Sequence, residues 1–263
     1  MNTIATLLYK EWLEFKQQRM LMLGIVALPL LLTLMPIGVT FATGQAPPKN
    51  GGDDLLAAAQ ANPALAGMSA IELGQAFVGQ TFSSIFLLMP LLMPSIIAAY
   101  SIVGEKTNRT LEPLLATPIK TWELLTGKIL AALIPTVAIS WLFGAIFIGG
   151  IAAVSVSQRV FAAIISPGWL TVLLLCTPLL GVIAIAAMVA ISARVNDPRT
   201  AQQLSAWVVL PFLLFFFGQL TGLIVLGPLA ALRAALALGL IAAAAVWAAT
   251  RLFQREVILT KWT

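Results

Sequence analysis

Long apolar runs separated by short polar segments dominate the chain. Six such runs can be drawn, at about residues 20–43, 76–103, 129–154 and 169–193, with two more sharing residues 204–250. A helix that crosses a bilayer needs about 20 consecutive apolar residues, whereas the strands of a transmembrane barrel alternate over short stretches. The pattern therefore predicts an all-α membrane protein, with six transmembrane helices forming a single domain over residues 1–263.

The first 19 residues have a different pattern. Apolar side chains recur there at helical spacing among charged ones, at Ile4, Leu7, Leu8, Trp12 and Phe15. Such a segment is typical of an amphipathic helix that lies in the membrane interface. We single out Trp12, Phe15 and Lys16 as the residues of this interfacial helix.

A polar segment over residues 44–75, rich in Gly, Pro, Asn and Asp, forms the predicted loop after the first span. Near its end, Ser69 and Glu72 have the spacing of a capping box, in which each side chain bonds a backbone N–H of the other residue. We expect a helix to begin there and to continue into the second span, which Pro90 and Pro94 should kink.

Residues 104–128 form a charged island between the second and third spans. Thr110 can cap a short helix over residues 111–116, and Pro118 then breaks it. Thr121 can cap a second helix that runs on into the third span, which Pro135 interrupts. The segment is thus predicted to be a folded helix–break–helix element, although a simple interfacial anchor for the loop is an alternative.

The charges define the orientation. Twelve Lys and Arg residues lie in segments 1–19, 104–128, 194–203 and 251–263, against three in the other connections. Because cytoplasmic loops are enriched in these residues, both termini and the island are predicted to be cytoplasmic. The net charge of +5 therefore reflects topology, and we expect no nucleic-acid partner. Five tryptophans fall near predicted interfaces, at Trp12, Trp122, Trp169, Trp207 and Trp247.

The composition excludes several kinds of chemistry. The chain is 60% hydrophobic and 10% charged, and it has no histidine and one cysteine, Cys176, inside an apolar run. Histidine-based catalysis and zinc sites of the HExxH type are therefore excluded, and no phosphate-binding loop is present. We expect no enzyme activity, no metal and no bound cofactor in this chain. The apolar stretches contain no Asp, Glu, Lys or Arg, which argues against ion-coupled transport, although carbonyls and hydroxyls can bind sodium.

The island also resembles a known family. Its sequence from Glu105 to Lys128, with Thr-Leu-Glu at 110–112, Thr-Pro-Ile at 117–119 and Glu-Leu-Leu at 123–125, is similar to the signature between spans two and three of ABC-2 type permeases. These are the membrane subunits of type-2 ABC exporters. The order of spans and loops fits along the whole chain. Arg109 is a departure, since members often have glycine there.

The resemblance implies a cytoplasmic coupling helix that docks on a separate ABC ATPase subunit, which binds the ATP and Mg. It also implies a second permease copy, with a homodimer favoured over a heterodimer, in the inner membrane of a prokaryote. Short re-entrant helices are expected before span six, around residues 218–232. The coupling residues are expected to be Glu105, Arg109, Thr110, Leu111, Glu112, Leu114, Leu115, Pro118 and Glu123.

The substrate path is expected to be lined by polar side chains of spans two and five, at Gln80, Thr81, Ser84 and Gln219. Alternatively, the hydroxyls bond their own backbone. A path without charges suits export of an amphipathic drug, peptide or lipid-like molecule. Sodium export, polysaccharide export, an ATP-independent secondary transporter and a membrane scaffold are the alternatives.

Overall fold

We describe the protein from a computed structural model. It describes residues 3–17, 19–45, 65, 67–98, 101, 121–192, 195, 200, 203–204, 206–220 and 227–252. All regular secondary structure within these residues is helical, which confirms the all-α prediction. Five of the helical segments are long and apolar enough to cross a membrane: Met22–Gln45, Ala70–Ala98, Thr126–Val154, Gln158–Ser192 and Pro228–Thr250.

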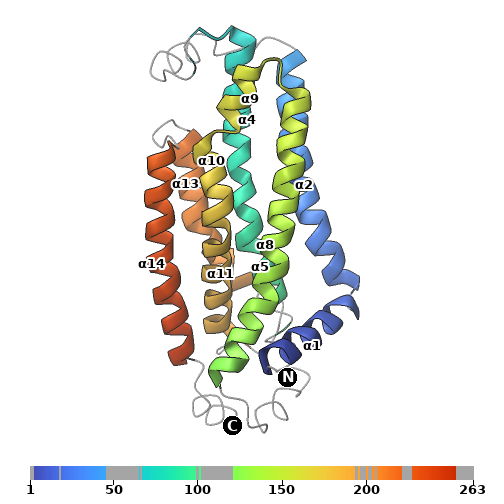
Figure 1. The fold of residues 1–263 in the computed structure, drawn as a ribbon, viewed down its shortest axis with the longest axis vertical. Helices are drawn as coiled ribbons and strands as arrows, with labels where there is room; N and C mark the ends of the chain where they lie inside the picture. Colours follow the sequence, from blue (N-terminus) through green and yellow to red (C-terminus); the bar gives the residue numbers. More distant parts are fainter. Residues whose placement is uncertain are drawn as a thin grey trace.

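The chain begins with α1 (Thr3–Gln17), which leads into α2 (Arg19–Gln45). The first helix lies at the lower end of the bundle, beside the start of α8 (Thr121–Val154), and the last turn of α14 (Pro228–Leu252) is at the same end (Figure 1). The first and last described helices therefore both reach the lower end of the bundle.

The second crossing contains three segments, namely α4 (Ala70–Ser83), a 3-10 segment η2 (Ser84–Leu88) and α5 (Met89–Ala98). The capping box is confirmed, because Ser69 and Glu72 exchange both hydrogen bonds. The 3-10 segment ends two residues before Pro90, which has no N–H to offer the Phe86 carbonyl. The N–H of Met89 bonds that carbonyl instead, so the proline changes the helix type.

The third crossing is α8, an unbroken helix of 34 residues. It begins at Thr121 and runs through Gly127 and Lys128, as predicted. The predicted interruption at Pro135 was wrong, because the helix continues through that residue. Proline is tolerated inside membrane helices where neighbouring groups satisfy the freed carbonyl.

The fourth crossing begins earlier than the sequence predicted. Residues assigned to a short outer loop instead form α9 (Gln158–Ile164) and α10 (Pro167–Thr171), because Ser157 and Ser166 cap them by accepting N–H bonds. A π-helical segment η4 (Val172–Cys176) then joins α10 to α11 (Thr177–Ser192). Cys176 is buried, as expected for a small apolar side chain.

The last part of the described chain comprises η5 (Ala206–Val209), α13 (Leu210–Leu220) and α14. The expected re-entrant region includes residues 221–226, which lie outside the described residues. Its final part, residues 228–232, forms the first turn of α14, where Pro228 starts the helix and the N–H of Ala231 bonds the Gly227 carbonyl at 2.9 Å. Arg233, which the sequence placed in a connection, therefore lies in the second turn of α14.

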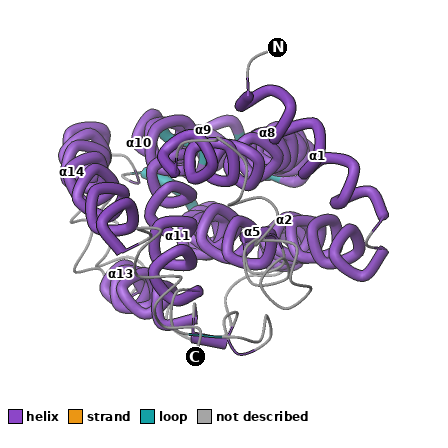
Figure 2. The backbone as a smooth tube through the Cα atoms, turned by 90° about the horizontal axis from the view of Figure 1, so that it is seen from below, coloured by secondary structure: helices purple, strands orange, loops and turns teal. Residues whose placement is uncertain are grey.

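The helices pack around α11, which contacts α14, α5 and α8, while α2 packs on α4 and α8. The view from below shows α11 and α5 in the middle, with α14 and α1 on opposite flanks (Figure 2). Many large apolar side chains on α2, α8 and α14 are exposed, including Leu31, Leu142 and Leu240. This distribution is expected of a bundle whose outer surface faces lipid.

Candidate functional site

One face of α1 docks the helix on the start of α8. Leu7, Glu11 and Phe15 are spaced four residues apart and therefore share that face. Leu7 and Glu11 are buried, and Phe15 packs against the main hydrophobic core. A Cβ added at Gly127 would lie 3.1 Å from Leu7 Cδ1. The missing side chain of Gly127 thus allows α1 to approach α8 closely.

The other face of α1 is open. Tyr9, Trp12 and Leu13 are 65%, 50% and 41% exposed, so apolar and aromatic surface is left uncovered at the end of the bundle. This arrangement fits the predicted interfacial helix, in which aromatic side chains sit at the level of the lipid headgroups. Of the three residues singled out for this helix, Trp12 lies on the open face and Phe15 on the docked face. The side chain of Lys16 lies outside the described residues.

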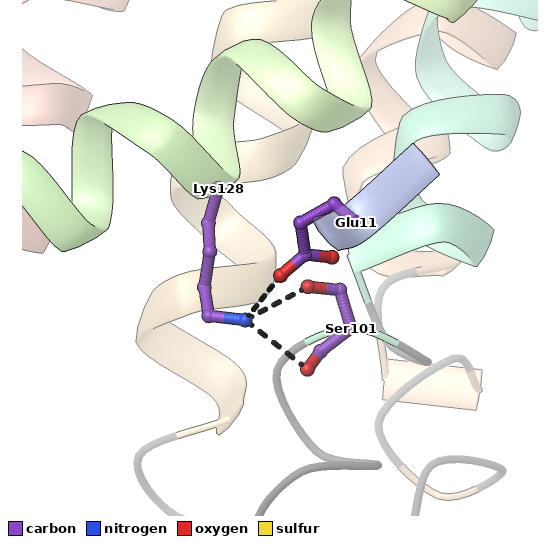
Figure 3. A network of polar contacts seen from close by, with 3 residues as sticks. All are labelled: Glu11, Ser101 and Lys128. Carbon is purple, nitrogen blue, oxygen red and sulfur yellow. Dashed lines mark hydrogen bonds and ion pairs between the residues drawn. The ribbon is translucent and has the colours of Figure 1, made fainter. Parts of the chain in front are cut away.

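A buried ion pair fixes α1 to α8. Lys128 Nζ lies 2.9 Å from Glu11 Oε1, and it also donates to Ser101 Oγ at 3.0 Å and to the Ser101 carbonyl at 3.4 Å (Figure 3). An ammonium group has three N–H donors, and each of these three acceptors lies within hydrogen-bond distance of the Lys128 ammonium. Glu11 and Lys128 are only 2% and 3% exposed, so the pair is almost completely shielded from solvent.

The pair keeps Glu11 ionised despite its burial. Burial by itself raises the pKa of Glu11, but the charge and hydrogen bond of Lys128, with smaller contributions from Ser101 and Lys10, outweigh it. The pKa of Glu11 therefore lies below its ordinary value. Removing one partner of a buried ion pair costs about 3–5 kcal/mol, because the other charge is left uncompensated. The contact between α1 and α8 consequently resists being pulled apart.

Most of the predicted coupling residues lie outside the described residues, namely Glu105, Arg109, Thr110, Leu111, Glu112, Leu114, Leu115 and Pro118. Glu123 is described, in the first turn of α8, where its charge is favourable next to the helix N-terminus. The chain enters this stretch after Ser101 and leaves it at Thr121. The polar contact of Ser101 with Lys128 thus brings the two flanks of the island together beside α1.

A second polar contact ties the helices at the opposite end of the bundle. Gln75 of α4 is fully buried. Its Nε2 donates to the Thr40 carbonyl of α2 and to the Val154 carbonyl at the end of α8, both at 2.9 Å. Its Oε1 accepts the N–H of Val156 at 3.0 Å. One amide therefore joins the ends of three crossings.

The predicted substrate-path residues of the second span have partners within the protein. Gln80 Nε2 donates to the Ala163 carbonyl of α9 at 2.9 Å. Ser84 Oγ donates to the Gln80 carbonyl at 3.4 Å, and Ser83 Oγ does so at 2.7 Å. Thr81 is buried. These bonds follow the alternative expectation that hydroxyls bond their own backbone. The side chain of Gln219 lies outside the described residues.

The π-helical segment η4 depends on a tryptophan from another crossing. The N–H of Thr177 bonds the Val172 carbonyl, and the next residue, Pro178, has no N–H. The Leu173 carbonyl therefore receives no N–H from Thr177 or from Pro178. Trp141 Nε1 of α8 donates to it instead, at 3.2 Å. An irregular turn at membrane depth is thereby satisfied from within the bundle, as the absence of water in the bilayer requires.

Trp169 does not belong to an aromatic belt, contrary to its sequence assignment. It is 5% exposed and packs with Phe86 and Phe147, at ring-centroid distances of 6.1 and 5.4 Å. Its Nε1 donates to the Ser83 carbonyl at 3.4 Å. The early start of the fourth crossing explains the difference. Trp169 lies in α10, after α9, and therefore inside the crossing and not at its start.

Sequence reasoning missed the roles of Glu11 and Lys128. Lys128 was counted among the cytoplasmic cations and Glu11 among the polar residues of the first helix. The available signal was the spacing of Glu11 within the Leu7–Phe15 stripe, which places a carboxylate on a buried face. Within the described residues, no group of three or more His, Cys, Asp or Glu residues is arranged to hold a metal ion.

Comparison with known proteins identifies the family. The sequence model for ABC-2 family transporter proteins matches residues 5–256, which is nearly the whole chain. No match was found among curated proteins. With the several membrane-crossing helices, this match makes the protein a multi-pass permease component of an ABC transporter. The chain therefore belongs to the ABC-2 transporter family.

Proposed function

We propose that the protein is the membrane permease subunit of an ATP-driven exporter, which moves an amphipathic substrate out of the cytoplasm of a prokaryote. A separate cytoplasmic ABC ATPase binds ATP and Mg and supplies the energy, and a second copy of the chain completes the path. The observation that carries this proposal is the family match over residues 5–256, together with the buried ion pair that brings both flanks of the island to α1.

The distribution of charge supports an energy source outside the spans. Within the five described crossings, Asp, Glu, Lys and Arg occur only near the helix ends, at Glu72, Lys128, Arg159 and Arg233. Ion-coupled transporters usually place ionisable groups at membrane depth. Coupling to a partner ATPase needs no such group, because the force enters at the cytoplasmic surface.

The path of the chain supports a sixth crossing and cytoplasmic termini. α11 ends at the lower end of the bundle and α14 begins towards the upper end (Figure 1). The intervening chain, which includes α13, has to pass from one end to the other. Both the first and the last described helices then reach the side where twelve of the fifteen Lys and Arg residues are expected.

The first experiment is reconstitution in proteoliposomes with a candidate ABC ATPase subunit from the same organism. We expect the two proteins to co-purify, and substrate efflux to require ATP. Transport at the same rate without any ATPase would contradict the proposal and would favour the secondary-transporter alternative.

The second experiment tests the island. We expect Glu112→Lys and Pro118→Leu to reduce transport-coupled ATP hydrolysis while the permease still elutes as a folded protein. Arg159→Glu is the matched control, since it reverses a charge on an exposed residue of α9 at the other end of the bundle. Wild-type coupling in both island variants would remove the coupling role from these residues.

A further inference from the structure

Three groups that are far apart in sequence meet at the base of the bundle. Glu11 comes from α1, Ser101 follows α5, and Lys128 lies in the third turn of α8. The chain between Ser101 and Lys128 contains the island that, under the proposed function, receives the ATPase. The Lys128 ammonium therefore closes this loop at its two ends and binds α1 at the same point (Figure 3).

The geometry makes this junction stiff. A helix can slide along another when only apolar side chains separate them, but a buried ion pair has to keep its partners within hydrogen-bond distance. Glu11 and Lys128 are 2.9 Å apart and almost fully buried. One turn earlier on α1, Leu7 packs onto Gly127. Two consecutive residues of α8 are thus engaged by two residues of α1 that lie one turn apart.

We infer that Glu11, Ser101 and Lys128 are positioning residues for energy coupling, which make α1, the two ends of the cytoplasmic loop and α8 move as one body. This inference rests on the proposed function, because it assumes that the loop is where the ATPase acts. A displacement of the loop then moves α8 and α1 together. Because α1 leads into α2, the same displacement reaches the first crossing.

The decisive variant is Glu11→Leu/Lys128→Met, which removes both charges and keeps the bulk of both side chains. Replacing a buried ion pair by apolar residues of similar volume is often neutral for stability, so the variant is expected to fold. The matched control is Tyr9→Phe/Ile134→Leu, which changes the same two helices at residues that are 65% and 54% exposed.

The main readout is the amount of a fluorescent amphipathic dye exported per ATP hydrolysed, measured in proteoliposomes with the partner ATPase. We expect the control to match the wild type and the Glu11→Leu/Lys128→Met variant to lose at least about fivefold, the lower end of typical coupling factors between two sites. A purely structural role would lower the yield of folded protein and leave this ratio unchanged. A wild-type ratio in the charge-free variant would overturn the inference.

A spectroscopic readout tests the shared movement directly. Spin labels at Tyr9→Cys and Ile134→Cys, in a Cys176→Ala background, report the distance between α1 and α8. We expect ATP to leave the distribution of this distance unchanged in the otherwise wild-type complex. In the charge-free variant, we expect ATP to broaden the distribution. An ATP-dependent distance in the complex with the ion pair intact would refute the inference. Failure of the proposed function is a separate result, in which the wild-type permease shows no ATP-dependent transport with its partner.

Discussion

Replacing Gln75 by leucine tests whether one amide holds together the outer ends of three crossings. The substitution keeps an apolar side chain of similar length at a fully buried position. It removes the bonds to the Thr40 carbonyl, the Val154 carbonyl and the Val156 N–H. The Thr40 carbonyl keeps the hydroxyl of Thr43 as a donor at 2.9 Å. The carbonyl of Val154 and the N–H of Val156 lose their side-chain partner.

The cost follows from these bonds. Three interhelical hydrogen bonds at the average found in a membrane protein, about 0.6 kcal/mol each, give about 2 kcal/mol as a lower value. The Val154 carbonyl and the Val156 N–H lie in partly buried bonds, so the cost of a fully buried unpaired group, about 1–3 kcal/mol each, sets an upper value of about 6 kcal/mol. Gln80→Leu is the matched control, because it removes one bond, to the Ala163 carbonyl, from the same helix. We therefore expect Gln75→Leu to be at least twice as costly.

The assay is reversible unfolding of the purified permease in detergent, with the free energy of unfolding compared among wild type, Gln75→Leu and Gln80→Leu. A second observable is the thermal midpoint, which falls by about 2–4 °C per kcal/mol in proteins of 150–250 residues. If Gln75→Leu is no more destabilising than Gln80→Leu, the three bonds do not act together and the assignment of Gln75 as a junction is refuted.

Three further predictions concern other contacts. Gly149→Ala is expected to be neutral or to stabilise the protein by up to about 1 kcal/mol, because an added Cβ there has no atom within contact distance. Gly150→Ala should cost about 1–3 kcal/mol, because its Cβ would overlap the side chain of Ile37. Equal free energies of unfolding for the two variants would contradict this pair of expectations. Trp141→Phe should cost about 1–3 kcal/mol, because it leaves the Leu173 carbonyl of η4 without its donor. The measurement is the thermal unfolding midpoint, with Trp207→Phe, at an exposed residue, as the control that should show no such loss. The pKa of Glu11 is lowered, so the stability that its charge contributes is complete above about pH 4.3, the ordinary pKa of glutamate. This stability is lost as the pH falls through the lower pKa of the folded state. The measurement is the unfolding midpoint against pH for the wild type and Glu11→Gln, and a wild-type advantage that already disappears above about pH 5 would refute the sign.

The sequence predicted those features that depend on neighbouring residues. The capping box at Ser69 and the continuation of the helix from Thr121 into the third crossing were both found as expected. The partners in each case lie within a few residues, so local preference decides the outcome. The first and third crossings also lie close to their predicted bounds, because their extent follows the apolar content of the chain.

The sequence could not predict contacts between distant segments. Gln75 lies at the end of the predicted polar loop, and its acceptors and donor lie 35, 79 and 81 residues away. Glu11 and Lys128 are 117 residues apart. The early start of the fourth crossing was missed because Ser157 and Ser166 look like ordinary loop residues until their caps are seen. Such features depend on how helices pack, which local patterns do not determine.

The Gln75 junction also has a consequence for how the protein is made. When α4 emerges from the ribosome, Thr40 has already been synthesised, but Val156 follows 81 residues later. At about 5–20 residues per second, the amide waits about 4–16 s for the last of its partners. During that interval a polar side chain has to be kept out of lipid. We therefore expect the first three crossings to be released into the bilayer together, after the third has been completed.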